Sequence, residues 1–199
     1  MVAQLPALYS KLFTQRYMLK PVDPRLGLPL FSPAMTGISL KDRLGVGPTG
    51  ILMTLLVWSG FYYGGRALDL PPMSVYPILR LLLLIMFLAD AIYLVGGGIY
   101  ALRTQGWGEK LITSGPFLFV RHPLYSALIY SATGSLALWQ YSWSVLVAVI
   151  PLSFLWSWLV SFEEQKMIEK FGREYEDYCL TTGQFFPSLK HLDDKISRF

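Results

Sequence analysis

The sequence has few cysteines and histidines, the residues that form disulfides and most zinc sites. A single cysteine, Cys179, excludes an intrachain disulfide. With two histidines and no HExxH or CxxC motif, a structural zinc site is not expected. The net charge is only +4, and the basic residues form no cluster typical of nucleic-acid binding. We therefore expect no metal and no nucleic-acid partner.

Charge is also scarce. Charged residues make up 15% of the chain and hydrophobic residues 53%, whereas soluble domains average about 25% charged. This balance predicts an integral membrane protein. No short apolar stretch followed by small residues opens the chain, so we expect no cleavable signal peptide and insertion through internal segments.

Four apolar stretches predict membrane-crossing helices, at about 48–65, 76–102, 124–139 and 144–162. The third is rich in small residues, which let membrane helices approach closely, and Pro151 should kink the fourth. The last two form a predicted C-terminal helical hairpin around a turn at 140–143. An amphipathic helix follows from Glu163, with apolar residues at three- and four-residue steps and its end before Pro187.

The amino-terminal part is harder to assign. Residues 1–46 carry a short amphipathic pattern and then several prolines, which predicts an interfacial or re-entrant region. Residues 26–40 are apolar but interrupted, and a fifth membrane helix there stays open. The predicted fold is therefore an all-α integral membrane protein with four to five transmembrane helices, whose core spans 47–199.

Two features interrupt the second predicted span. Asp90 lies in mid-segment, where a bare carboxylate costs at least a few kcal/mol. We favour a structural hydrogen bond over a substrate contact for this side chain. Gly96, Gly97 and Gly98 weaken the helix, and we expect them to allow close packing against another helix.

Lysine and arginine concentrate in the stretches 1–46, 103–123 and 163–199. With four spans, these three stretches share one side of the membrane. By the positive-inside rule, that side is cytosolic. We therefore expect a multi-pass protein with cytosolic termini and a site that faces the cytosol.

The centre of the sequence is the stretch 111–125, in which Arg121, His122 and Pro123 lie between two apolar segments. Pro123 suits the first turn of the following helix. The backbone N–H groups of Arg121 and His122 would then lie near the positive end of the helix dipole, where a carboxylate or phosphate binds. An interfacial anchor is the alternative. The hairpin should bring Glu163 and Glu164 to the same membrane face.

A basic half and an acidic half suit a zwitterionic soluble ligand. Glu163 would hold an ammonium group, and Arg121 with His122 a carboxylate. S-adenosyl-L-methionine has both groups, and its adenine could pack on an aromatic or apolar side chain such as Phe117, Leu111 or Tyr125. Methyl transfer from a sulfonium needs alignment and a dry site rather than a covalent nucleophile. These residues alone do not distinguish this ligand from other anions.

Two motifs make a more specific resemblance. The segment GPFLFVRHPLY at 115–125, followed by FEEQKMIEKFGREYEDYC at 162–179 and Pro187, resembles the isoprenylcysteine carboxyl methyltransferase family, over roughly residues 103–190. The resemblance implies an S-adenosyl-L-methionine-dependent membrane methyltransferase. It implies catalytic roles for Arg121, His122 and Glu163. It places the cofactor against Glu109, Lys110, Leu111, Ile112, Phe117, His122, Pro123, Leu124, Tyr125 and Glu163, and we add the adjacent Glu164.

One departure concerns the acceptor. The eukaryotic prenylcysteine enzymes carry an arginine four residues before the matching glutamate, and this sequence has Leu159 there. A prenylcysteine carboxylate, a phospholipid amine, a thiol or another small lipophilic acceptor all stay open. Two other interpretations also stay open. Membrane sterol reductases that use NADPH share an Arg-His-Pro-x-Tyr pattern, and a non-catalytic membrane scaffold would use the hairpin for packing.

Overall fold

A computed structural model describes residues 45–106 and 109–188, all within one compact unit. These residues are helical and contain no strand; one isolated bridge joins Val120 and Gly183. The predicted all-α class is therefore confirmed for this part of the chain. Residues 26–40, where the sequence leaves a fifth helix open, and nearly all of the predicted interfacial or re-entrant region at 1–46 lie outside the described residues.

The first two helices are long and begin at prolines. Helix α3 (Gly47–Ala67) has Pro48 in its first turn, and α4 (Pro77–Gln105) begins at Pro77 itself. Proline suits this position because its missing N–H would have no helical partner there. The most apolar 18-residue stretch of α4 has a mean hydropathy of 2.4, and only 6% of that stretch is buried. Helix α4 therefore presents most of its apolar surface outward.

Two glycines of α4 allow it to pack closely on the stretch that carries the site. A Cβ at Gly97 would lie 2.8 Å from Cγ of Pro116, and one at Gly98 would lie 2.7 Å from Cδ1 of Leu124. Pro116 belongs to the short 3-10 helix η1 (Gly115–Leu118) and Leu124 to α5 (Pro123–Ser126). The predicted packing role is confirmed for these two glycines, whereas Gly96 faces open space.

Asp90 accepts a structural hydrogen bond, as the sequence analysis favours. The hydroxyl of Ser131 donates to its carboxylate. Ser131 lies in η2 (Ala127–Ala132), a stretch of π-helix between α5 and α6 (Thr133–Trp139). The bond links α4 to this π-helical stretch, so a structural role for the carboxylate is confirmed.

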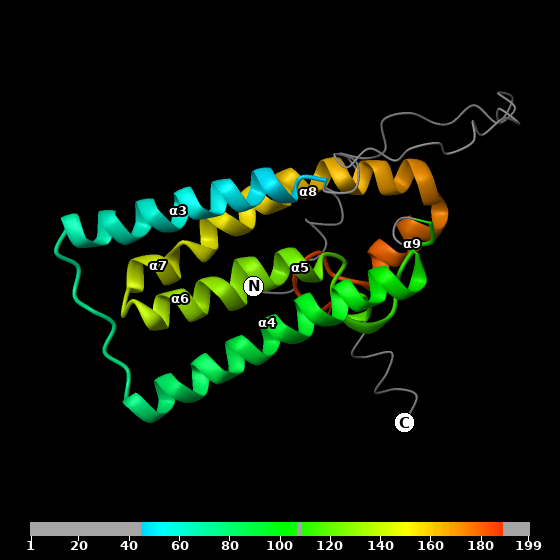
Figure 1. Ribbon diagram of the computed structural model, residues 1–199. Coiled ribbons are helices and arrows are strands. Elements are labelled where there is room, and N and C mark those ends of the chain that lie inside the picture. Colours follow the sequence, from blue (N-terminus) through cyan, green and yellow to red (C-terminus); the bar gives the residue numbers. More distant parts are fainter. Residues whose placement is uncertain (1–44, 107–108, 189–199) are drawn as a thin grey trace, which may run out of the picture. The chain divides into compact units, whose positions relative to one another are not determined.

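The chain then reverses into α7 (Trp143–Val147) and α8 (Val149–Phe171), which run back alongside α5–α6 (Figure 1). The break at Ala148 agrees with the predicted kink, since Pro151 has no N–H for the carbonyl of Val147. The membrane span predicted to reach 162 and the amphipathic helix predicted from Glu163 belong to one continuous helix. Helix α8 continues through Glu163 and Glu164 to Gly172, whose φ of 55° ends it, and α9 (Arg173–Thr181) follows.

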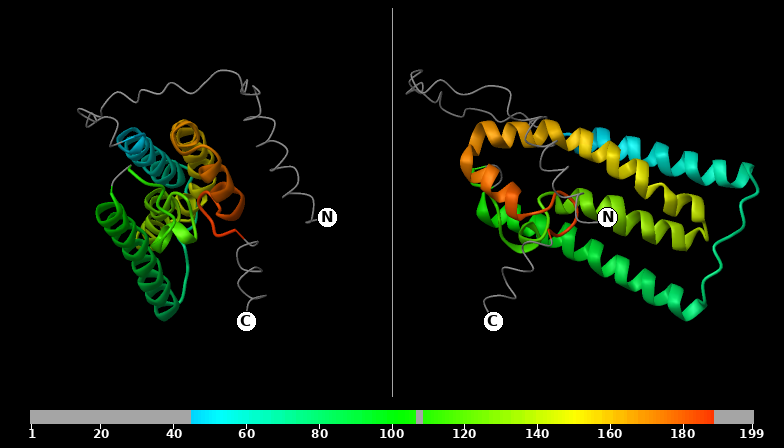
Figure 2. Two further views of the ribbon diagram at one scale, coloured as in Figure 1. Left: turned by 90° about the vertical axis from the view of Figure 1, so that its right-hand side faces the viewer. Right: turned by 180° about the vertical axis from the view of Figure 1, so that it is seen from behind.

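Of the described helical segments, two are long and apolar enough to cross a membrane: Pro77–Gln105, and Trp143–Phe171, which joins α7 and α8. Figure 2 shows α3, α5–α6, α7–α8 and α4 with their long axes roughly aligned. The core between them centres on Trp156 of α8, which is fully buried and donates to Thr54 of α3 over 2.9 Å. This core fixes α8 against α3 and so positions Glu163 and Glu164, which lie about two helical turns further on.

Candidate functional site

The centre of the site is a buried ion pair between the predicted turn and α8. Arg121 donates to Oε1 of Glu164 from Nε over 2.9 Å and from Nη2 over 2.8 Å. His122 contacts the same oxygen through Nε2 at 3.2 Å. Glu164 is 1% exposed. The predicted meeting of the two polar clusters is therefore present, although some forty residues separate them in sequence.

The rest of Arg121 is held by backbone. Its Nη1 donates to the carbonyls of Thr182 at 2.6 Å and Cys179 at 3.3 Å. Burial is the largest single influence and lowers the pKa of Arg121, but the charges of Glu164, Cys179 and Tyr175 and the hydrogen bond to Glu164 together outweigh burial and raise that pKa. Arg121 is thus a fixed cation whose donors are directed to the protein itself.

The predicted anion site at the backbone N–H groups of Arg121 and His122 is not available. These groups donate to the carbonyls of Gly183 over 2.8 Å and Gln184 over 3.2 Å. The segment after α9 runs beside residues 120–122, and Ser126 also donates to Phe185 over 2.7 Å. Because this segment fills the position in front of the helix end, a carboxylate or phosphate cannot use the same donors.

Glu163 has a different environment from its neighbour. It is half-buried, and its Oε1 accepts from the backbone N–H of Val46 at 2.8 Å and from the hydroxyl of Tyr125 at 3.0 Å. No donor among the described residues reaches its Oε2. Gly45 lies against this carboxylate, since a Cβ there would come 2.0 Å from Oε1. Glu163 is therefore a positioned carboxylate with one oxygen that no described donor reaches.

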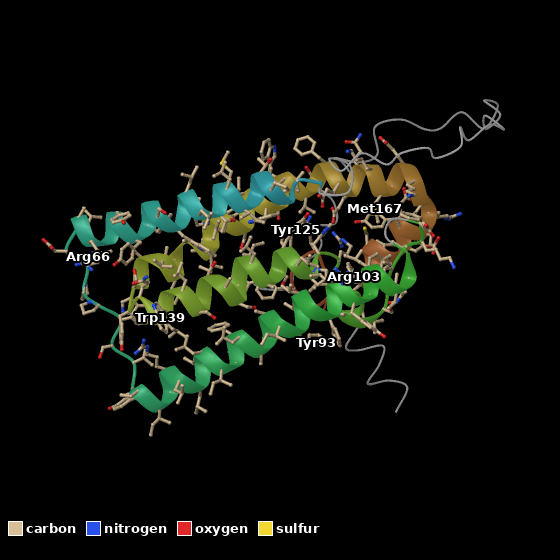
Figure 3. All side chains as sticks on the ribbon, viewed as in Figure 1. Arg66, Tyr93, Arg103, Tyr125, Trp139 and Met167 are labelled. Atoms are coloured by element: carbon tan, nitrogen blue, oxygen red, sulfur yellow. The ribbon has the colours of Figure 1, made fainter. Side chains whose placement is uncertain are left out.

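Aromatic rings form one wall beside Glu163. Tyr125 stacks on Trp156 with ring centroids 4.4 Å apart, and His122 lies nearly parallel to Tyr125 at 5.8 Å. Tyr125 extends from α5 toward α3 and α8 (Figure 3). The wall is an apolar, π-bearing surface next to a carboxylate.

The other predicted cofactor residues are placed unequally. Ile112 and Pro123 are buried, Leu111 and Phe117 are half-buried, and Leu124 packs on Gly98. Glu109 and Lys110 are exposed, and no described contact joins them to the Arg121–Glu164 cluster. Leu159, one turn before Glu163, is buried in the Trp156 core.

Several residues of the site carry no signal in the sequence. The segment 182–185 closes the site through its carbonyl groups, which any residue type provides. Tyr178 donates to the carbonyl of Phe117 over 2.5 Å, and burial raises the pKa of the Tyr175 and Tyr178 hydroxyls. In the sequence both tyrosines belong to an apolar stripe and to the motif at 162–179 that carries the family resemblance, but neither was predicted as a site residue. Among the described residues, no group of His, Cys, Asp or Glu could hold a metal ion.

Comparison with known proteins agrees with this geometry. Residues 77–174 match the model of the family described as phospholipid methyltransferase. The chain is therefore similar to the methyltransferases of this family and, as the two motifs predict, to the isoprenylcysteine carboxyl methyltransferases.

The relatives that carry this likeness are the probable protein-S-isoprenylcysteine O-methyltransferases of Oryza sativa subsp. indica and subsp. japonica. Each is 35% identical over 82 residues, which cover 41% of this chain and 43% of the rice protein. The chain thus spans less than half the length of the curated relatives that it matches.

Proposed function

We propose that this protein transfers a methyl group from S-adenosyl-L-methionine to a lipophilic acceptor at the cytosolic face of a membrane. The observation that carries the proposal is the position of Glu163. This half-buried carboxylate has one oxygen without a described donor, and it lies beside the ring wall of Tyr125 and His122. A carboxylate next to aromatic faces suits a ligand with an ammonium group, a sulfonium and a purine ring.

The residues present fit that cofactor in their chemistry. Glu163 would hold the ammonium group, and the faces of His122 and Tyr125 would pack against the purine or the sulfonium. Phe117, Leu111, Glu109 and Lys110 would complete the pocket from the preceding loop. Arg121 and Glu164 fix the His-Pro turn relative to α8, and so set the distance between His122 and Glu163.

When bound, the cofactor supplies an electrophilic methyl carbon, to which the acceptor's electron pair bonds as the carbon–sulfur bond breaks and its electrons pass to sulfur. The protein has to align these atoms and exclude water. His122 lies on the half-buried turn beside Glu163, and we propose that it orients the acceptor or receives a proton from it. Buried Leu159 offers no charge to an acceptor carboxylate, so the acceptor class stays broader than prenylcysteine.

We further propose a multi-pass arrangement in which α3, α4, α5–α6 and α7–α8 all cross the bilayer. Helix α3 has 21 residues, which at about 1.5 Å per residue is about 31 Å, close to the thickness of a bilayer core. The basic stretches place the Arg121–Glu164 end on the cytosolic side. There the cofactor would enter from water and the acceptor from lipid.

The test is isothermal titration of S-adenosyl-L-methionine into the detergent-solubilised protein. We expect binding, with an affinity about tenfold or more weaker in Glu163→Gln because a charge-assisted hydrogen bond is lost. Glu169→Gln, an exposed glutamate of the same helix, is the matched control. Equal affinity in Glu163→Gln would remove Glu163 from the site. Binding of NADPH instead of S-adenosyl-L-methionine would favour the reductase alternative.

A further inference from the structure

A second polar site lies at the far end of the bundle from Arg121 and Glu164. Helix α3 joins the two ends. Its first residues lie near Tyr125, and Gly65 near its other end packs against Ser144 of α7. A cavity of about 340 Å³ opens at this second end, lined by residues from 62–72 and from 140–144. Figure 3 labels Arg66 at this end and Tyr125 near the other.

The cavity carries one cation and one anion that no residue in the described part of the chain pairs in an ion pair. Arg66 and Asp69 both line it, and neither forms an ion pair within the described ranges. The Arg66 guanidinium donates a long hydrogen bond of 3.4 Å to the hydroxyl of Tyr62, and its central carbon lies 5.9 Å from the centre of the Tyr62 ring. Gln140, Ser142 and Ser144 add neutral polar groups to the lining. The cavity is thus equipped for a ligand with both charges.

The backbone around the cavity is strained and firmly held. In the described residues, Asp69 and Tyr141 are the only non-glycine residues with positive φ, at 49° and 53°, and both line this cavity. A bulky residue rarely adopts that conformation, and such strain concentrates at functional positions. Arg80 lies 3.6 Å from the centre of the Tyr141 ring and donates to its hydroxyl, and Met73 donates to its carbonyl over 2.7 Å.

The surroundings indicate a ligand from the membrane. Trp139, Tyr141 and Trp143 are exposed around this end, and aromatic residues of this kind are typical of the lipid headgroup level. In the proposed arrangement, in which the 21-residue helix α3 crosses the bilayer, the cavity lies at the opposite face from the proposed methyl-transfer site. Tyr62 and Trp143 give the cavity aromatic faces, which suit a quaternary ammonium group beside Asp69.

We propose that this cavity binds the headgroup of a zwitterionic phospholipid, with the phosphate at Arg66 and the ammonium group at Asp69. The proposal rests on the proposed membrane placement but not on methyl transfer. The bound lipid would anchor the turns at 66–72 and 140–144 to the leaflet opposite the proposed methyl-transfer site.

The experiment is calorimetric titration of the full chain in detergent with dihexanoyl phosphatidylcholine, dihexanoyl phosphatidylglycerol and inorganic phosphate. We expect phosphatidylcholine to bind most tightly. Arg66→Gln should weaken binding of both lipids about tenfold, since the lost contact is charge-assisted. Asp69→Asn should weaken only phosphatidylcholine, and Arg66→Lys should retain most of the affinity.

Exposed residues of α9 give the matched controls Arg173→Gln and Asp177→Asn, which should leave lipid affinity unchanged. Phosphatidylcholine affinity that is unchanged in Arg66→Gln or in Asp69→Asn would overturn the proposal. So would inorganic phosphate that binds as tightly as the lipid. S-adenosyl-L-methionine affinity, measured on the same samples, should not change, and its absence in the unmodified protein would count against the methyltransferase proposal alone.

Discussion

The two ends of the bundle differ in whether their charged side chains are paired with each other. At one end, the charges of Arg121 and Glu164 neutralise each other in a buried pair, and backbone carbonyls take the remaining guanidinium donors. At the other end, Arg66 and Asp69 stay unpaired by the described residues and face a cavity. The first end uses ionic contacts to hold two distant segments together. The second leaves its charges available to a ligand.

The same contrast exists between two adjacent glutamates. Glu164 faces inward and serves the fold, whereas Glu163, one residue earlier on α8, is half-buried and has an oxygen available. A helix turns by about 100° per residue, so neighbours point in different directions. Glu164 thus stabilises the fold, and Glu163 is the carboxylate that we propose to contact the ligand.

The largest expected effect comes from breaking the buried pair. Glu164→Gln leaves the Arg121 charge buried and uncompensated, which should lower the free energy of unfolding by about 3–5 kcal/mol. Glu163→Gln should lower it by about 1 kcal/mol or less, because only hydrogen bonds at a half-buried carboxylate are weakened. Thermal unfolding in detergent, followed by circular dichroism, measures both. Similar losses in the two variants would contradict the division of roles.

Packing at the site end is tested by Gly50→Ala. A Cβ there would lie 2.2 Å from Cη2 of the buried Trp156, so the variant should lose about 1–3 kcal/mol through overpacking. Gly60→Ala is the control on the same helix, because nothing lies within 4 Å of its Cβ. It should be neutral or stabilising by up to about 1 kcal/mol. A stable Gly50→Ala variant would show that α3 can move away from α8.

At the cavity end, Arg80 is expected to matter more for stability than Arg66. Arg80→Leu removes the hydrogen bond of 2.9 Å to the Leu138 carbonyl and the contact with the Tyr141 ring, a loss of about 1–2 kcal/mol. Arg66→Gln should change stability by less than about 0.5 kcal/mol. Chemical denaturation of the two variants checks this, and the reverse order would mean that Arg66 holds the turn.

The last prediction concerns chemical reactivity rather than stability. Burial, with a further contribution from the charge of Glu164, outweighs the opposing charge of Arg121 and raises the pKa of Cys179 to about 11. Only the thiolate reacts with iodoacetamide, so alkylation at pH 8 should be about a hundredfold slower than for an ordinary exposed cysteine. The rate should rise about tenfold per pH unit until pH 11. The unfolded protein is the control, and rapid alkylation of the folded protein at neutral pH would place Cys179 outside the buried cluster.

Much of the helical layout could be predicted from the sequence, because apolar runs and prolines act locally. Pro48, Pro77 and Pro123 lie in the first turns of their helices, and the interruption before Pro151 follows from its missing N–H. The membrane span and the amphipathic helix that the sequence predicts on either side of Glu163 form one helix, α8. Charged residues mark the end of an apolar stretch, but they do not end a helix. Helix α8 therefore continues past Glu163 and Glu164 until Gly172.

The site itself was predicted in part. The motifs identified Arg121, His122, Glu163 and Glu164, and hydropathy indicated that they share one end of the bundle. The sequence could not predict which glutamate pairs with Arg121, because a rotation of α8 about its axis would exchange Glu163 and Glu164. The packing around Trp156 sets the rotation of α8. Residues 182–185 contribute backbone carbonyls, which every residue type has, so the sequence gives no sign of their role. That two of these carbonyls accept from the N–H groups of Arg121 and His122 is seen only in the folded chain.

By itself, the sequence determined the all-α class, the positions of most helix starts and the likeness to lipid-related methyltransferases, because these depend on composition, on local backbone chemistry and on motifs. The tertiary structure alone decided which carboxylate is buried, which N–H groups remain free and where Arg66 and Asp69 meet a cavity. Those properties depend on the rotation and spacing of packed helices, which are set by contacts between residues far apart in the chain.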